Sequence, residues 1–481
     1  MTLSALTKAA AISAAVSLLA ACATMSRLTK RTAESPSQPW VPPPSELRRP
    51  EPKPAPLIPP ELQAPGRVWT LGDIVAVGLA NNLQTRAAWN AARAASAGVA
   101  IALGRYLPVI DTTLTGTKQK AVFAGGQFII DQTTLTPQAN LSYLLFDFGG
   151  REATVSEARR ALEAANWTQN AVLQRVILQI ESAYYQFLSA KALLQAQEAS
   201  RASAQTNYEA ADVRHKAGVA TVADVLQAKT ALSSLDLQIV TTKGLIQDLH
   251  GTLANAAGLP ADTAFEVAQG LPEEIPFEEI SRQVDLAIKE AEARRPDLAA
   301  SRATVLQADA AVRKARSTFF PSFSLSGDIG RVYYQGKTSS NPFYSLSVTA
   351  DLSFLFGLQS YAVLQAKALA EQARDQMTDL SRTIDLQVWT SYYGLKTAEQ
   401  EIKTAGDLLE SAQASADVAL GRYKEGVGSV LDLLSAEAAL EDARVQIVRA
   451  RSDWFQALVQ FLHDTGTLTP PSGPEKGDHR P

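Results

Sequence analysis

Hydrophobic and polar residues alternate strictly in two pairs of segments. In residues 134–145 the apolar side chains take every second position, with hydroxyl and amide side chains between them, and residues 344–354 repeat the pattern. Alternating partner segments, 108–118 and 321–333, precede them. A period of two is that of a β-strand with one apolar and one polar face. The sequence therefore predicts two β-hairpins, at about 108–146 and 321–356.

The predicted strands are about 10–13 residues long, the length of a tilted strand that crosses a bilayer. The alternative is a pair of ordinary soluble hairpins whose apolar sides pack on a core. The segments that follow each hairpin argue against that alternative. Two stretches of more than 120 residues, 138–259 and 343–469, contain no proline, and apolar residues such as Val172, Val176 and Ile180 recur at helical spacing.

One strong break interrupts each proline-free stretch, at Gly218 and at 426–428. The sequence therefore predicts two helices on the order of 100 Å long at 1.5 Å per residue. Each is expected to be flanked by a shorter preceding helix and a returning helix that together match its length. The expected long helices are 151–217 and 358–425, the returning helices 222–257 and 430–462, and the preceding helices 83–105 and 297–317.

The two breaks lie in a repeated motif. Residues 214–228 and 422–436 share Arg, Lys, Gly, two Val, Asp, Leu and Ala in register, at an offset of 208 residues from Gly218 to Gly426. Tyr106-Leu-Pro and Phe319-Phe-Pro stand before the two hairpins. This self-similarity predicts a tandem duplication. The expected copies are residues 68–260, with a helical tip at 214–224, and residues 281–466, with a tip at 422–432; a crossing at 261–280 joins them, and a flexible tail follows at 467–481.

The N-terminus carries a different signal. An apolar run of about 13 residues follows Lys8, which suits a signal peptide and is too short for a membrane-spanning helix. It ends in Leu19-Ala20-Ala21-Cys22, which resembles the lipobox of bacterial lipoproteins. We expect residues 1–21 to be removed and Cys22 to be acylated. The alternative is a plain secretory signal cut after Ala21 or Ala23.

Residues 22–67 are predicted to form an extended tether behind the acylated cysteine. Half of the 24 prolines lie between Pro36 and Pro65, where they fix φ and remove backbone donors. A proline-rich ligand for a partner is the alternative.

Composition removes several classes of function. The formal net charge of −4 argues against a polybasic nucleic-acid binder. Hydrophobic residues make up 46% of the chain, which is ordinary for a globular protein and low for a multi-span helical membrane protein. One cysteine and four separated histidines provide neither a disulfide nor a metal cluster. We expect no enzyme, no metal and no cofactor.

A four-stranded amphipathic sheet cannot lie in lipid with open edges, because its edge backbone groups would be unpaired. It has to close by self-association. A dimer, trimer or tetramer would give 8, 12 or 16 strands, and a barrel of 12 or more can enclose water.

The lipobox, the duplicated hairpins, the paired long helices and the glycine turns followed by Asp-x-Leu together resemble the TolC-like outer-membrane efflux proteins. The resemblance covers residues 68–466. It implies a mixed α/β membrane protein: a homotrimer with a 12-stranded outer-membrane β-barrel, four strands per chain, continued by a periplasmic α-helical barrel. It also implies a lipid-anchored exit duct of a tripartite efflux or type I secretion system.

Such a duct would receive substrates from a periplasmic adaptor and an inner-membrane pump of the resistance-nodulation, ABC or major-facilitator type. The sequence does not define the substrate. The alternative is a non-conducting periplasmic helical lipoprotein scaffold, which the two hydroxyl-faced hairpins oppose.

By the same resemblance, the helical tips close the channel and bind the adaptor. The implied docking residues are Lys216, Gly218, Val219, Thr221, Tyr423, Gly426, Val427, Gly428 and Ser429. Glycines at the two breaks would supply the positive φ that reverses the chain.

The resemblance places Asp224, Asp432 and Tyr423 at the periplasmic aperture, where a carboxylate ring would favour cations. The alternative for both aspartates is that they cap the returning helices. A bond between Tyr423 and Asp224 is one way to hold the closed state. Some family members carry an arginine where this chain has Gly428, and others a second aspartate where it has Ser435, so the lock is expected to be weaker here.

Overall fold

The fold is described from a computed structural model. It covers residues 58–64, 66–123, 128–268, 270–272, 283–335, 340–352 and 357–468. The predicted signal peptide, Cys22, most of the expected tether and most of the tail at 467–481 lie outside the described residues, as does part of the crossing at 261–280.

The helices occur in two matching sets, which confirms the tandem repeat. Each set contains helices of 11, 22, 67 and 35 residues in the same order. The first set is α2 (Leu71–Asn81), α3 (Leu83–Gly104), α4 (Gly150–Lys216) and α5 (Val222–Ala256); the second is α6 (Val284–Arg294), α7 (Pro296–Ser317), α8 (Leu358–Lys424) and α9 (Val430–Asp464). A short 3-10 helix, Pro60–Gln63, precedes the first set.

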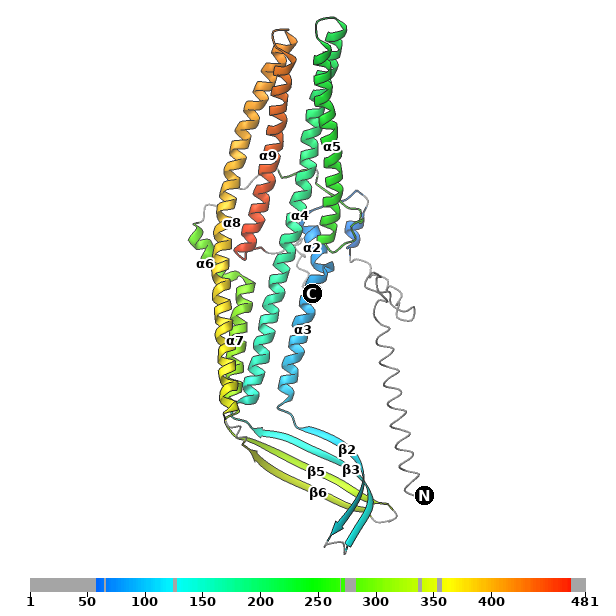
Figure 1. Ribbon diagram of the computed structural model, residues 1–481, viewed down its shortest axis with the longest axis vertical. Coiled ribbons are helices and arrows are strands. Elements are labelled where there is room, and N and C mark those ends of the chain that lie inside the picture. The colour runs from blue at the N-terminus through cyan, green and yellow to red at the C-terminus, as the bar shows by residue number, and fades with distance from the viewer. Residues whose placement is uncertain are drawn as a thin grey trace, which may run out of the picture. The chain divides into compact units, whose positions relative to one another are not determined.

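Two shorter helices lie end to end beside each long one, as the helix lengths predicted. In the first copy α3 and α5 pack along α4, and in the second α7 and α9 pack along α8 (Figure 1). Helix α4 also contacts α7 and α9, so that the two copies join side by side. The resulting order is α3 and α5, then α4, then α7 and α9, then α8. Helices α3 and α5 therefore form one lateral edge and α8 the other.

The four long strands form one antiparallel sheet. They are β2 (Val109–Phe123), β3 (Phe128–Phe146), β5 (Ser322–Tyr334) and β6 (Ser340–Asp351), in the order β2-β3-β5-β6. Strands β5 and β6 have 13 and 12 residues, close to the predicted length, but β2 and β3 have 15 and 19. Our estimate was too short because it followed the apolar alternation, whereas backbone pairing continues past Lys120 and Asp131.

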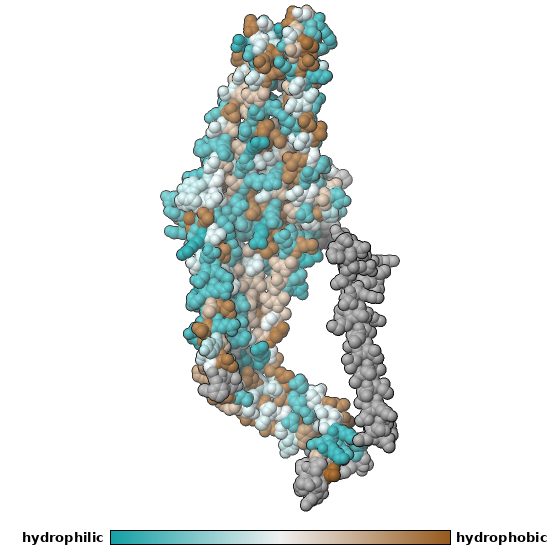
Figure 2. All heavy atoms as spheres, viewed as in Figure 1, coloured by the Kyte–Doolittle hydropathy of each residue, from teal (hydrophilic) through white to brown (hydrophobic). Residues whose placement is uncertain are grey.

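The apolar face of this sheet is exposed in the single chain. Opposite residues of paired strands share a face, and the register gathers apolar side chains from all four strands on one side. The residues of this apolar face with exposed side chains are Ile110, Leu114, Leu135, Ile329, Tyr333, Tyr344, Leu346 and Val348. Hydrophobic and polar residues are interspersed over the sheet in Figure 2.

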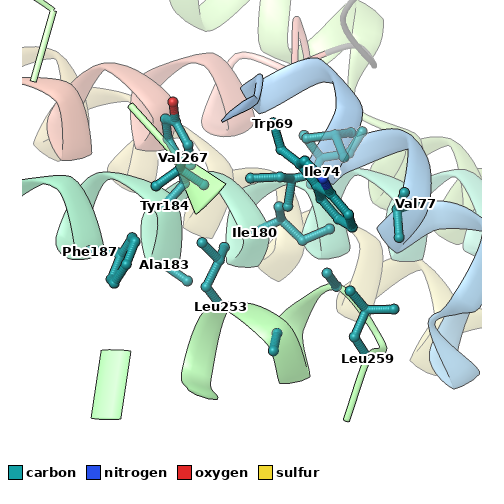
Figure 3. Packing of buried hydrophobic residues seen from close by; sticks show 14 of the residues in the cluster. Trp69, Ile74, Val77, Ile180, Ala183, Tyr184, Phe187, Leu253, Leu259 and Val267 are labelled. Carbon is teal, nitrogen blue, oxygen red and sulfur yellow. The ribbon is translucent and has the colours of Figure 1, made fainter. Parts of the chain in front are cut away.

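The largest apolar core lies where α2, α4 and α5 meet. Ile74 and Val77 of α2 pack with Ile180 of α4 and Leu253 of α5, all nearly inaccessible to solvent (Figure 3). A parallel pair of two-residue strands, β1 (Val68–Trp69) and β4 (Glu266–Val267), covers this cluster. This core fixes α2 and α5 along α4.

A buried carboxyl lies on α4 next to that core. Glu181 is 8% exposed, and burial raises its pKa to about 7 from the ordinary value of 4.5. Between pH 4.5 and 7 the folded state binds more protons than the unfolded state. The free energy of unfolding therefore falls as the pH rises through this interval, and the destabilisation by Glu181 is complete above pH 7.

We therefore expect Glu181→Gln to stabilise the protein above pH 7, by about 2 kcal/mol per chain, and to flatten the pH dependence between 4.5 and 7. Unfolding midpoints in detergent across that range would measure it. Glu209→Gln, on an exposed part of the same helix, is the control and should change little. A stability profile for Glu181→Gln identical to that of the unmodified protein would contradict the assignment.

Candidate functional site

The two helical hairpins end in the same turn at the same end of the molecule (Figure 1). After α4 and α8 the chain reverses at Gly218 and Gly426, both with φ of 76°. In the first turn Val219 N–H donates to the Arg214 carbonyl, and in the second Val427 N–H donates to the Arg422 carbonyl, both at 3.0 Å. These six-to-one bonds with a left-handed glycine define a Schellman motif. The predicted positive φ of both glycines is confirmed.

The returning helices begin with capping boxes. Asp224 N–H donates to the Thr221 hydroxyl, and the Asp224 carboxylate accepts from the Thr221 N–H at 2.8 Å. Ser429 and Asp432 repeat the arrangement at the start of α9. The bonds from Ser429 hold the pKa of Asp432 below its ordinary value. The capping role of both aspartates is thus confirmed, and their role in a carboxylate ring stays a prediction.

The ends of the hairpins expose apolar side chains. Val219 and Val427 are 66% and 69% exposed, and Val222 and Leu431 beside them are also exposed. Hydrophobic side chains gather among polar ones at this end in Figure 2. Exposed apolar groups that cluster are typical of an interaction surface. The Lys216 ammonium lies beside this patch and pairs with Asp212 at 2.6 Å.

Gly428 lies against the last turn of α8. A β-carbon at this position would stand 3.1 Å from the Arg422 Cβ and 3.2 Å from backbone atoms of Arg422 and Tyr423. The turn therefore favours glycine where some relatives were expected to carry arginine.

Tyr423 differs from the expectation in two respects. Its side chain is buried, with 6% exposed, whereas a side chain that contacts an adaptor has to be accessible. Within the chain it does not bond to Asp224, whose carboxylate caps α5. Instead the Arg214 guanidinium lies over the Tyr423 ring, 4.7 Å from its centroid, and donates to the Tyr423 carbonyl at 2.8 Å. The sequence motif contained Arg214, but we assigned it no role.

The polar face of the sheet is a second candidate surface. The register aligns Asp111, Asn140, Asp328 and Ser345 in one row across all four strands. The Ser345 hydroxyl donates to the Asp328 carboxylate, and the Asn140 side chain accepts from Gln138 at 3.1 Å. Sequence reasoning missed this row because it depends on the pairing register. The row supplies carboxylates to a surface otherwise dominated by hydroxyl groups.

Two further findings concern the described part of the chain. None of the helices there is long and apolar enough to cross a membrane. The same residues contain no group of three or more His, Cys, Asp or Glu side chains placed so that they could hold a metal ion.

The family model of the outer membrane efflux proteins matches residues 77–259 and 287–467, once for each copy. The chain belongs to this family, which consists of outer-membrane efflux and secretion ducts. The fold described above, with a tandem repeat of strand hairpins and long helices, is that of TolC-like channels.

Among characterised relatives, the chain is similar to the pyoverdine export outer membrane protein OpmQ of Pseudomonas aeruginosa, with 25% identity over 79% of this chain and 82% of that protein. Protein CyaE of Bordetella pertussis is 26% identical over 80% of this chain and 78% of its own. The solved channel OprN superposes with a TM-score of 0.73 at 19% identity, covering 83% and 91% of the two chains. The structure of VceC from Vibrio cholerae gives 0.72 at 19% identity, over 82% and 96%.

Proposed function

We propose that the chain forms a homotrimeric exit duct, with a closed 12-stranded barrel continued by a helical barrel in the periplasm. The observation that carries the proposal is the four-stranded sheet, whose apolar face is exposed and whose outer strands, β2 and β6, are its edges. Lipid would cover the apolar face, and pairing of β2 with β6 of the next chain would satisfy the edge backbone groups.

The lateral edges of the helical part support the same association. Strand β2 follows α3 and strand β6 precedes α8, so each edge strand continues an edge helix. Both edges expose apolar side chains: Leu83, Trp89 and Ile101 on α3, Leu226, Leu237 and Val240 on α5, and Leu364, Leu386 and Val418 on α8. Contact between the α3 and α5 edge of one chain and the α8 edge of the next chain would bury these side chains.

The proposed partners are a periplasmic adaptor, which docks on the hairpin ends, and an inner-membrane pump of the resistance-nodulation, ABC or major-facilitator type. The exposed Val219 and Val427, together with the charged Lys216 in the first turn, support docking there. The duct conducts passively. Its hydroxyl-lined face offers hydrogen bonds to many polar solutes and needs no tight recognition of any one of them.

Lipid anchoring is part of the proposal and rests on Leu19-Ala20-Ala21-Cys22. The mature protein, in the outer membrane, should begin at an acylated Cys22, and mass spectrometry of its N-terminal peptide would measure this. Cys22→Ser should still assemble, because a closed barrel is held in the membrane by its own apolar band. An unmodified N-terminus at Ala23 or beyond would contradict the anchor while leaving the barrel untouched.

Conductance tests the duct itself. Purified full-length protein in planar bilayers should give discrete channels, and their selectivity should favour cations because of the row that contains Asp111 and Asp328. The protein could insert as an oligomer and yet never conduct, even after the contacts between its helical hairpins have been weakened. That result would instead favour a non-conducting helical scaffold.

A further inference from the structure

The surface between the two helical hairpins of one chain is polar near their ends. Three positions of α4, each seven residues from the next, contact the second hairpin. The Ser200 hydroxyl accepts from Arg444 at 3.0 Å, the Asn207 amide donates to Glu437 at 3.4 Å, and Arg214 binds Tyr423. Seven-residue spacing is that of a coiled-coil seam, where apolar side chains would be usual.

The inside of each hairpin contains apolar clusters in addition to polar contacts such as Arg201 with Asp236. Ala204, Leu232 and Leu235 join α4 to α5. Ala412, Leu440 and Ala443 join α8 to α9, and Val430 and Leu433 extend that contact to the turn. Each hairpin is therefore a firm unit. Among the described residues no apolar cluster joins the two hairpins near their ends, so the seam there is the weaker contact and the place where they can separate.

Arg214 forms the contact of this seam nearest the turns. Its guanidinium stacks on the Tyr423 ring, and its Nη1 donates to a carbonyl in the last turn of α8, the negative end of the helix dipole. The same carbonyl accepts from the Gly426 N–H at 3.1 Å, so Arg214 is tied to the turn itself.

The Tyr423 hydroxyl has no part in this contact. It is buried and has no hydrogen-bond partner among the described residues. The duplicated arginine provides a comparison: Arg422 occupies the matching position of the second hairpin but is exposed, whereas Arg214 is half-buried. Only one copy of the repeated arginine thus reaches across the seam.

We infer that Arg214 latches the closed end of the duct by holding the second hairpin through the ring face and the main-chain carbonyl of Tyr423, and not through its hydroxyl. Opening the end then means breaking this contact first and the Asn207 and Ser200 contacts after it. The inference rests on the proposed duct function.

The test is the open probability of purified oligomers in planar bilayers without adaptor. Arg214→Gln should raise it by about tenfold or more, since a stacked and hydrogen-bonded guanidinium is lost from every chain. Arg214→Lys keeps the charge but loses the planar stack, and should give a smaller rise. Tyr423→Phe keeps the ring and the carbonyl and should behave as the unmodified protein does. Arg422→Gln is the matched control and should also stay closed.

Three outcomes overturn the inference. Arg214→Gln could remain as closed as the unmodified protein, Tyr423→Phe could open as far as Arg214→Gln does, or Arg422→Gln could open equally. Native mass of each variant, measured first, shows whether assembly is intact, and Arg214→Lys carries the test if Arg214→Gln does not assemble. Absence of channels from every variant, including the unmodified protein, would instead count against the duct.

Discussion

Leu346→Arg is expected to prevent assembly in the outer membrane. Leu346 lies in the middle of β6, on the apolar face, and its side chain is 72% exposed in the single chain. A closed barrel would turn this side chain into lipid, where an arginine near the bilayer midplane costs about 2–4 kcal/mol. Every chain of the oligomer carries the substitution. The amount of oligomer in outer-membrane fractions measures the effect.

The neighbouring residue provides the control. Ser347 points to the opposite face, where its hydroxyl lies 2.8 Å from that of Ser326. Ser347→Arg should assemble and should shift conductance from cations toward anions, because it adds a positive charge to the lumen in each chain. Equal assembly of the two variants would mean that the sheet does not face lipid. Assembly of Leu346→Arg alone would mean that the two faces are reversed.

Gly426→Trp is expected to leave an assembled duct that no longer supports efflux. The position has φ of 76°, so any side chain pays about 1 kcal/mol or more of backbone strain. The indole would also stand among the exposed groups around Val427 and block the approach of an adaptor. Crosslinking to the adaptor and drug susceptibility of cells that carry the variant would measure this loss.

Gly426→Ala separates bulk from strain. Alanine has the same backbone strain at this φ but adds only a β-carbon, whose nearest neighbour would be Arg214 Nη2 at 3.9 Å. We expect it to retain most of the efflux. Normal efflux by Gly426→Trp would show that this turn is not the docking surface. Loss of efflux in both variants would assign the effect to the conformation of the turn.

The long helices could be predicted closely because their ends are marked by local chemistry. The absence of proline allows α4 and α8 to run for 67 residues, and Thr221 with Asp224 marks the start of α5. Each of these signals lies within a few residues of the boundary it defines. The sheet was predicted in the same way, from an alternation that its own residues carry.

The features that were missed depend on residues far apart in the chain. Strands β1 and β4 have two residues each and pair across nearly 200 positions of sequence. Helix α2 is separated from α3 by Asn82 alone, which caps the second helix, so no gap in the pattern marks it. The contact of Arg214 with Tyr423 needs two hairpins brought together by α4 and α9. Local periodicity contains none of this information.

The oligomeric state of the full-length protein in detergent tests the central claim most directly. Native mass spectrometry should give three copies of the mature chain, and electron cryomicroscopy of the same sample should show 12 strands in one closed barrel. In that barrel β2 of each chain should pair with β6 of the next, and α3 and α5 should lie against the neighbouring α8. A stable monomer that inserts and conducts, or a barrel of 8 or 16 strands, would contradict the account.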